Sequence, residues 1–180
     1  MSAGTLYLES ALKRLRNYKE LGDKTFSQLT ETDFHFQPNE SCNSIGVIIQ
    51  HMAGNMLSRW TDFMTSDGEK EWRNRDGEFE EQQMSKGQLL DFWEKGWNCC
   101  FNAISALTEA DLSKTIQIRT ESLTVVDAIN RQLAHYPSHV GQILLMGKII
   151  KGSNWQNLSI PKGHSASYNK DVQEGVKRQP

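Results

Sequence analysis

Four stretches of this chain repeat their apolar residues at helical spacing, and glycine, proline and polar runs separate the stretches. The spacing predicts helices over residues 5–29, 44–65, 85–107 and 124–151. Asn43 or Ser44 is predicted to cap the second helix, Ser85 the third and Thr124 the fourth, and Gly152 ends the last one. Four helices of about 30 Å each pack most simply side by side, so the pattern predicts an all-α four-helix bundle.

Two of the connections between these helices have features of their own. Residues 66–84 are rich in charge and glycine and form a longer loop than most helix–helix links, which is typical of functional or mobile segments. Within it, the charged run at residues 69–81 is predicted to be solvated. The connection at residues 108–123 contains a short alternating run at 116–119, which predicts a small hairpin.

The C-terminal segment follows the fourth predicted helix from residue 153 onward. Its first half, residues 155–168, contains apolar residues and is expected to pack in extended form on the bundle. The remainder is polar and charged. We therefore predict one domain over residues 1–168, tail included, and a flexible C-terminus at residues 169–180.

Composition narrows the classes of partner and compartment. The formal net charge of the 180 residues is −2, which argues against nucleic acid or an anionic membrane as the main partner. No apolar run approaches the ~18 residues of a spanning helix, and the N-terminus lacks a signal-peptide pattern. The cysteines lack the spacing of a disulfide framework or a zinc site, so a cytoplasmic protein is expected; they are Cys42, Cys99 and Cys100.

The histidines are the main candidates for chemistry. His135 and His139 lie four residues apart in the fourth predicted helix, so they share a face and can point at one metal ion. His51, from the second helix, would complete a three-nitrogen site with room for water. Spacing alone fits a hydrogen-bonded pair of core histidines as well, and both interpretations stay open at this point. His35 and His164 fall in a loop and in the tail, and their roles are not indicated.

Three residues near the histidines bear on how the histidine rings are oriented. Pro137 lies between His135 and His139 and predicts a kink or local loosening, because proline lacks the backbone N–H of a helix interior. A kink of this kind would re-aim the pair. Gln142 and Asn55, one turn from ligand candidates, are candidates to orient water or histidine N–H groups.

These residues together resemble a known family. His51, preceded by Asn-Ser-Ile-Gly at residues 43–46, and His135-x-x-x-His139-Val-Gly-Gln142 resemble the DinB/YfiT-like superfamily of metal-dependent proteins. The tail sequence Trp-Gln-Asn-Leu-Ser-Ile-Pro-Lys-Gly-His-Ser, residues 155–165, is similar more specifically to the DUF1572 subgroup of small bacterial proteins. The resemblance covers nearly the whole chain.

The resemblance implies an up-down-down-up four-helix bundle, often dimeric, with a metal held by His51, His135 and His139. The metal is commonly zinc or nickel, with water at an open position. Relatives include thiol-dependent S-transferases that use bacillithiol or mycothiol, and a thiol-dependent isomerase. No residue of this sequence can be matched to a thiol-cofactor site.

Two hypotheses about function follow. The first is a metal-dependent enzyme acting on a small molecule, with S-transferase-like chemistry on a low-molecular-weight thiol cosubstrate or with hydrolase-like chemistry. The second is a non-catalytic bundle, dimeric, that binds a small molecule or a protein and holds a structural metal or none. A homodimer is expected from the resemblance in either case.

Overall fold

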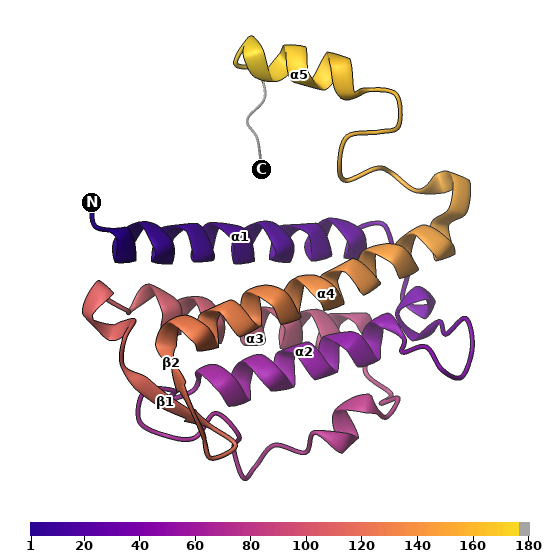
Figure 1. The fold of residues 1–180 in the computed structure, drawn as a ribbon. Helices are drawn as coiled ribbons and strands as arrows, with labels where there is room; N and C mark the ends of the chain where they lie inside the picture. Colours follow the sequence, from indigo (N-terminus) through magenta and orange to yellow (C-terminus); the bar gives the residue numbers. More distant parts are fainter. Residues whose placement is uncertain (177–180) are drawn as a thin grey trace.

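Figure 1 shows the fold as a computed structural model, which describes residues 1–176. These residues form five α-helices and one two-stranded antiparallel sheet, so the predicted helical class is confirmed. The helices are α1 (Ala3–Phe26), α2 (Ile45–Trp60), α3 (Lys86–Ser105), α4 (Val125–Lys151) and α5 (Ser165–Gln173). The strands are β1 (Thr115–Ile118) and β2 (Glu121–Thr124), and short 3-10 turns are η1 (Thr32–His35), η2 (Asp76–Phe79), η3 (Glu109–Asp111) and η4 (Gly152–Asn154).

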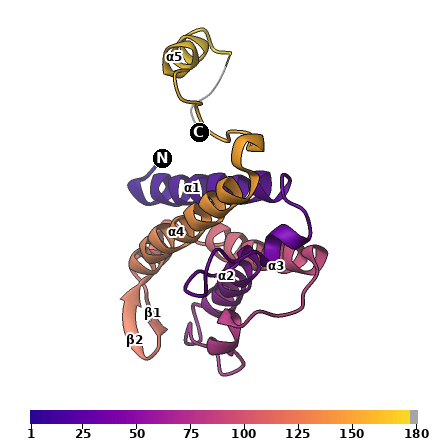
Figure 2. The same ribbon diagram turned by 90° about the vertical axis from the view of Figure 1, so that its right-hand side faces the viewer.

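The four long helices pack as two pairs, α1 with α4 and α2 with α3, and α4 also contacts α2 (Figures 1 and 2). Their apolar faces share a core around Trp93, Trp97 and Tyr136, which are at most 1% exposed. Helix α2 is the most enclosed, since every residue in it except Leu57 is buried. Its polar residues are therefore carried into the interior together with its apolar ones. None of the helices in residues 1–176 has both the length and the apolar character that crossing a bilayer requires.

Side-chain caps begin the helices where the sequence predicts them. The hydroxyls of Ser44, Ser85 and Thr124 each accept a hydrogen bond from a backbone N–H in the first turn of α2, α3 and α4. Ser85 and Gln88 form the predicted capping box. Gly152 follows α4 with a φ of 53°, a conformation that favours glycine.

Two helices end a few residues earlier than predicted. Helix α1 ends at Phe26 and α2 at Trp60, although Leu29 and Phe63 beyond them are only 4% and 6% exposed. The apolar spacing continues past each helix because the following turn also buries an apolar side chain. Asp62, with a left-handed φ of 48°, turns the chain after α2.

Helix α4 continues through Pro137, which lies in its interior. The proline supplies no backbone donor, and beside it the hydroxyl of Ser138 donates to the carbonyl of His135 at 2.7 Å. The predicted loosening at this position does not interrupt the helix. His135 and His139 therefore stay one helical turn apart on the same face.

The tail departs from the prediction of an extended segment packed on the bundle up to residue 168. Its beginning is attached to the bundle, where the backbone of Gln156 exchanges hydrogen bonds with the side chain of Gln28. From residue 165 the chain is helical, and α5 stands away from the other helices beyond α1 (Figure 1). Tyr168 and Val172 are its only large apolar residues, too few to hold it on the core. Residues 169–173 of the segment predicted to be flexible lie in this helix, and 177–180 lie outside the described residues.

The predicted hairpin is present as β1 and β2, paired from Thr115 with Thr124 to Ile118 with Glu121. Its turn residues Arg119 and Thr120 have φ values of 54° and 64°. Asp67, in the long loop after α2, accepts hydrogen bonds from both of their backbone N–H groups, at 2.8 and 2.7 Å. The loop and the hairpin are thereby joined beside the N-terminal part of α4.

A pair of glycine substitutions tests the close contact between α2 and α3. A Cβ on Gly96 would lie 2.9 Å from the Cα of Ala53, whereas a Cβ on Gly141 would meet nothing within 4 Å. Alanine gains similar helix propensity at both interior sites, so crowding alone separates them. We expect Gly96→Ala to be less stable than Gly141→Ala by about 1–3 kcal/mol in urea denaturation. Equal stabilities would contradict the contact.

Candidate metal centre

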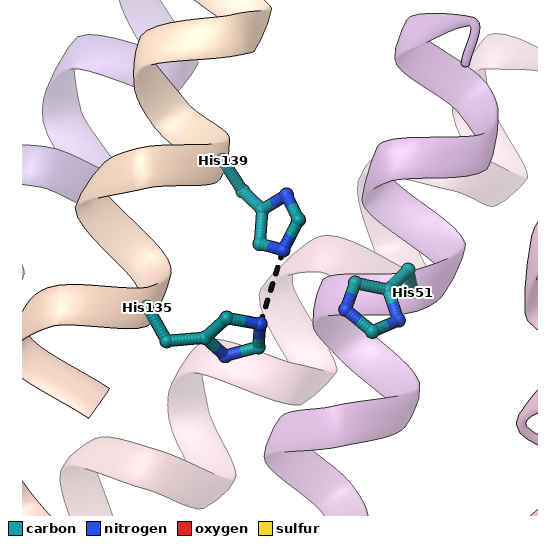
Figure 3. Close-up of side chains that lie close together, drawn as sticks. All are labelled: His51, His135 and His139. Carbon is teal, nitrogen blue, oxygen red and sulfur yellow. Dashed lines mark hydrogen bonds between the residues drawn. The ribbon is translucent and has the colours of Figure 1, made fainter. Parts of the chain in front are cut away.

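The three histidines predicted as metal ligands come together between two helices. His51 projects from α2, and His135 and His139 project from α4 (Figure 3). One ring nitrogen from each lies within 4.8 Å of the others, so the group could hold a metal ion. The Nε2 atoms of His135 and His139 are 3.0 Å apart. His51 is buried, and the other two rings are half-buried.

Each ring is oriented by an oxygen acceptor at its other nitrogen. Glu78 Oε2 lies 3.1 Å from Nδ1 of His51. Gln132 Oε1 lies 3.2 Å from Nδ1 of His135, and Gln142 Oε1 lies 2.9 Å from Nδ1 of His139. Side-chain oxygens accept hydrogen bonds here, so Nδ1 carries the proton and Nε2 carries the lone pair.

Burial and neighbouring charge keep the two rings on α4 neutral. Burial, and after it the charges of His139 and His51, lower the pKa of His135 from its usual 6.5 to about 4. Burial also lowers the pKa of His139, and the hydrogen bond with Gln142 opposes this only in part. At neutral pH both rings therefore present an unprotonated nitrogen.

This arrangement fits a divalent cation. With Nδ1 protonated on both rings, the lone pairs of His135 and His139 face each other at 3.0 Å without a proton between them. A hydrogen bond between the two Nε2 atoms would require one ring to carry its proton on Nε2 instead of Nδ1. The glutamine beside that ring, Gln132 or Gln142, would then have to rotate its amide so that its NH2 group faces Nδ1. A metal ion between the rings would instead accept all three lone pairs, and the 3.0 Å between His135 and His139 is close to the ~3.3 Å that separates nitrogens around tetrahedral zinc. Three imidazoles suit zinc, nickel and similar ions.

The long loop after α2 closes one side of the cluster, and this corrects the expectation that residues 69–81 are solvated. Glu78 is buried, and its two oxygens accept hydrogen bonds from Arg73 at 2.7 and 2.8 Å. Burial alone would raise the pKa of Glu78, but hydrogen bonds from Arg73 and His51 outweigh burial and lower it. Phe79 lies over His51 with ring centroids 4.6 Å apart. Trp72 of this loop is turned to solvent at 61% exposed, and Phe79 keeps 36% of its surface exposed beside His51.

A buried chain of hydrogen bonds runs behind the cluster. The indole of Trp60 donates to the hydroxyl of Tyr136 at 3.0 Å, and that hydroxyl donates to Oδ1 of Asn55 at 3.2 Å. Burial raises the pKa of Tyr136 well above its usual value, so it remains a neutral phenol. Asn55 thus contacts Tyr136 rather than a histidine, whereas Gln142 contacts His139 as the sequence indicates.

Some site residues were not found from the sequence. Gln132 stands three residues before His135, as Gln142 stands three after His139, and this helical spacing was a usable signal. Glu78 and Arg73 gave no signal, because a loop carries no periodicity that shows which side chains turn inward. The remaining histidines lie elsewhere: His35 contacts Glu81, and His164 is exposed at the start of α5.

A comparison with protein families assigns the chain. The model described as "Protein of unknown function (DUF1572)" matches residues 2–164. The chain belongs to the DUF1572 family. The matched region includes α1 to α4, the loop with Glu78 and all three clustered histidines, and it ends before α5. No curated protein matches the chain.

Acid titration of the metal-free DUF1572 protein tests the environment of His135. Its folded pKa of about 4 lies below the usual 6.5, so the unfolded chain binds more protons between these values. His135 should therefore cost stability progressively as pH falls from 6.5 towards 4. We expect His135→Asn to lose less stability than the wild type over this range, measured by urea denaturation of chelator-treated protein. His164→Asn is the control, and an unchanged slope in His135→Asn would contradict the assignment.

Proposed function

We propose that this DUF1572 protein is a metal-dependent enzyme in which His51, His135 and His139 hold one divalent ion. The observation that carries the proposal is the convergence of three Nε2 lone pairs whose Nδ1 partners are all oxygens. Zinc or nickel suits this donor set. Three protein ligands leave an open position, which is typical of catalytic rather than structural zinc sites.

We further propose that the chain belongs to the DinB/YfiT-like superfamily, with the up-down-down-up four-helix arrangement of that group. The pairing of α1 with α4 and of α2 with α3 is compatible with this connectivity. The placement of one histidine on the second helix and two on the fourth also supports the assignment. A cytoplasmic homodimer remains a prediction. Leu145 and Ile149, one turn apart and more than half exposed on α4, would suit a dimer face.

The protein's own residues prepare the site for such chemistry. Glu78, Gln132 and Gln142 hold the rings in one tautomer and one orientation. Phe79 covers one face of His51 and excludes water from it. A divalent ion held by the three rings would supply Lewis-acid chemistry, lowering the pKa of a water or thiol at its open position.

The pocket beside the histidines favours this role for the ion. Its lining residues among the described part of the chain include arginines, Asn55 and Gln132, but no carboxylate that could act as a general base. Activation of the nucleophile then falls to the ion. Attack by a low-molecular-weight thiol cosubstrate and hydrolysis by water are the two reactions this arrangement serves, and the substrate in both is a small molecule.

Metal stoichiometry tests the proposal. We expect the purified, tag-free wild type to bind about one equivalent of zinc or nickel after reconstitution. The triple variant His51→Ala, His135→Ala, His139→Ala should bind none while circular dichroism shows a folded helical protein. The double variant His35→Ala, His164→Ala, which removes histidines outside the cluster, should retain the metal. Full occupancy in the triple variant would refute the ligand assignment.

Activity assays then separate the enzyme from a non-catalytic bundle. The metal-loaded protein should turn over a chromogenic ester, or a chromogenic electrophile in the presence of added cysteine, and the triple variant should not. Thiol dependence distinguishes transfer from hydrolysis. A protein that binds the metal and loses stability on chelation, but turns over neither probe, would support the structural-metal alternative.

A further inference from the structure

A pocket adjoins the histidine cluster and is lined mainly by arginines. Its volume is about 190 Å³, somewhat more than the ~150 Å³ that holds a benzene molecule. Its lining residues are His51, His135, Asn55, Gln132, Arg59, Arg73, Arg75, Arg119 and Arg131. Five guanidinium groups thus surround a space that opens beside two of the three proposed ligands.

The arginines come from separate parts of the fold. Arg59 lies on α2, Arg73 and Arg75 in the loop that carries Glu78, Arg119 in the hairpin turn and Arg131 on α4. Like charges repel, so their convergence is unfavourable unless negative charge offsets it. The chain as a whole carries a formal net charge of −2, so this positive cluster is a local feature.

The protein offsets only part of this charge. Glu69 pairs with Arg59 at 3.1 Å and with Arg119 at 2.9 Å, and Glu78 pairs with Arg73 at 2.7 Å. Further acidic groups lie at the edge. Asp76, fully exposed, is 4.0 Å from Arg75, and Asp67 is occupied by backbone N–H groups of the loop and the hairpin turn.

One arginine in the lining has a buried donor without a hydrogen-bond partner. The side chain of Arg73 is 1% exposed, and its Nε and Nη2 donate to Glu78. Among the described residues, its Nη1 has no hydrogen-bond partner, and the nearest carboxylate, Glu69, lies 3.6 Å away. Buried polar groups are normally satisfied, so this donor is available to an oxygen atom that enters the pocket.

Two other arginines of the lining, Arg131 and Arg119, are exposed, and of these Arg119 already pairs with Glu69. In residues 1–176, the exposed side chain of Arg131 makes no hydrogen bond or ion pair, although its charge helps to lower the pKa of His135. Arg119 occupies a turn position with positive φ, where glycine or asparagine is usual, and Asp67 holds that turn in place. Glycine or asparagine would form this turn with less backbone strain than arginine does. The arginine side chain therefore has a use beyond the turn itself.

We propose that this pocket binds an anionic group, a carboxylate or phosphate, of the small-molecule substrate. Arginine recognises both through parallel N–H···O bonds. The anionic group would lie against Arg73, Arg75 and Arg131, and the rest of the molecule would extend towards the histidines. The substrate role rests on the metal-dependent function proposed above, whereas anion binding itself needs only the arginines.

Calorimetric titration of chelator-treated protein with sodium phosphate and with sodium succinate tests this inference. Ionic strength is held constant with chloride. We expect saturable binding of at least one of the two anions. The double variant Arg75→Gln, Arg131→Gln should weaken it by about tenfold or more, since two charge-assisted contacts are lost. The charge-matched control Lys13→Gln, Lys95→Gln, on exposed faces of α1 and α3, should leave affinity nearly unchanged.

The outcomes separate the two proposals. Binding of phosphate alone indicates a phosphorylated substrate, and binding of succinate alone indicates a carboxylate. No saturable binding of either anion, or equal weakening in the arginine and lysine variants, would overturn the anion pocket. Zinc stoichiometry is measured on the same proteins in buffer without either anion. Zinc binding without anion binding refutes this inference only, and anion binding without zinc binding refutes the metal site only.

Discussion

Three imidazole nitrogens that face one another without protons are the constraint on which the rest of the site depends. The contact between His135 and His139 is favourable only if a proton or a cation lies between the rings, and burial disfavours the charged ring that an added proton would create. The surrounding oxygens of Glu78, Gln132 and Gln142 strengthen this constraint, because they fix the lone pairs on the inner side. A divalent ion between the rings would accept these lone pairs and remove the repulsion between them. Its charge would then be the largest in the site.

The electrostatics of the loop after α2 follow from that arrangement. Glu78 lies between His51 and Arg73, so one carboxylate orients a ring and also anchors an arginine. A carboxylate at the second nitrogen of a ligand histidine raises its basicity. The arginines beyond it add positive charge on the side that faces solvent, and this charge attracts anionic molecules towards the histidines.

The features that could be predicted from the sequence are those that depend on residues close together in the chain. The caps at Ser44 and Ser85 and the helical spacing of His135 and His139 are short-range features, and the structure confirms the helices and brings the histidines together. The role of Glu78 could not be predicted, because it depends on a loop folding back over α2. Contacts of that kind depend on long-range packing, which neither composition nor periodicity encodes. The prediction of an extended tail is wrong from residue 165 onward, because a local helix forms there.

X-ray absorption spectroscopy of the zinc-loaded protein tests the central claim most directly, because it reports the atoms around the ion. The account predicts about three imidazole nitrogens at about 2.0 Å, with one further oxygen or nitrogen ligand from solvent. The imidazole scattering should disappear in the triple histidine variant. A sulfur ligand from Cys42, Cys99 or Cys100, or an ion surrounded by water alone, would contradict the claim that His51, His135 and His139 form the metal site.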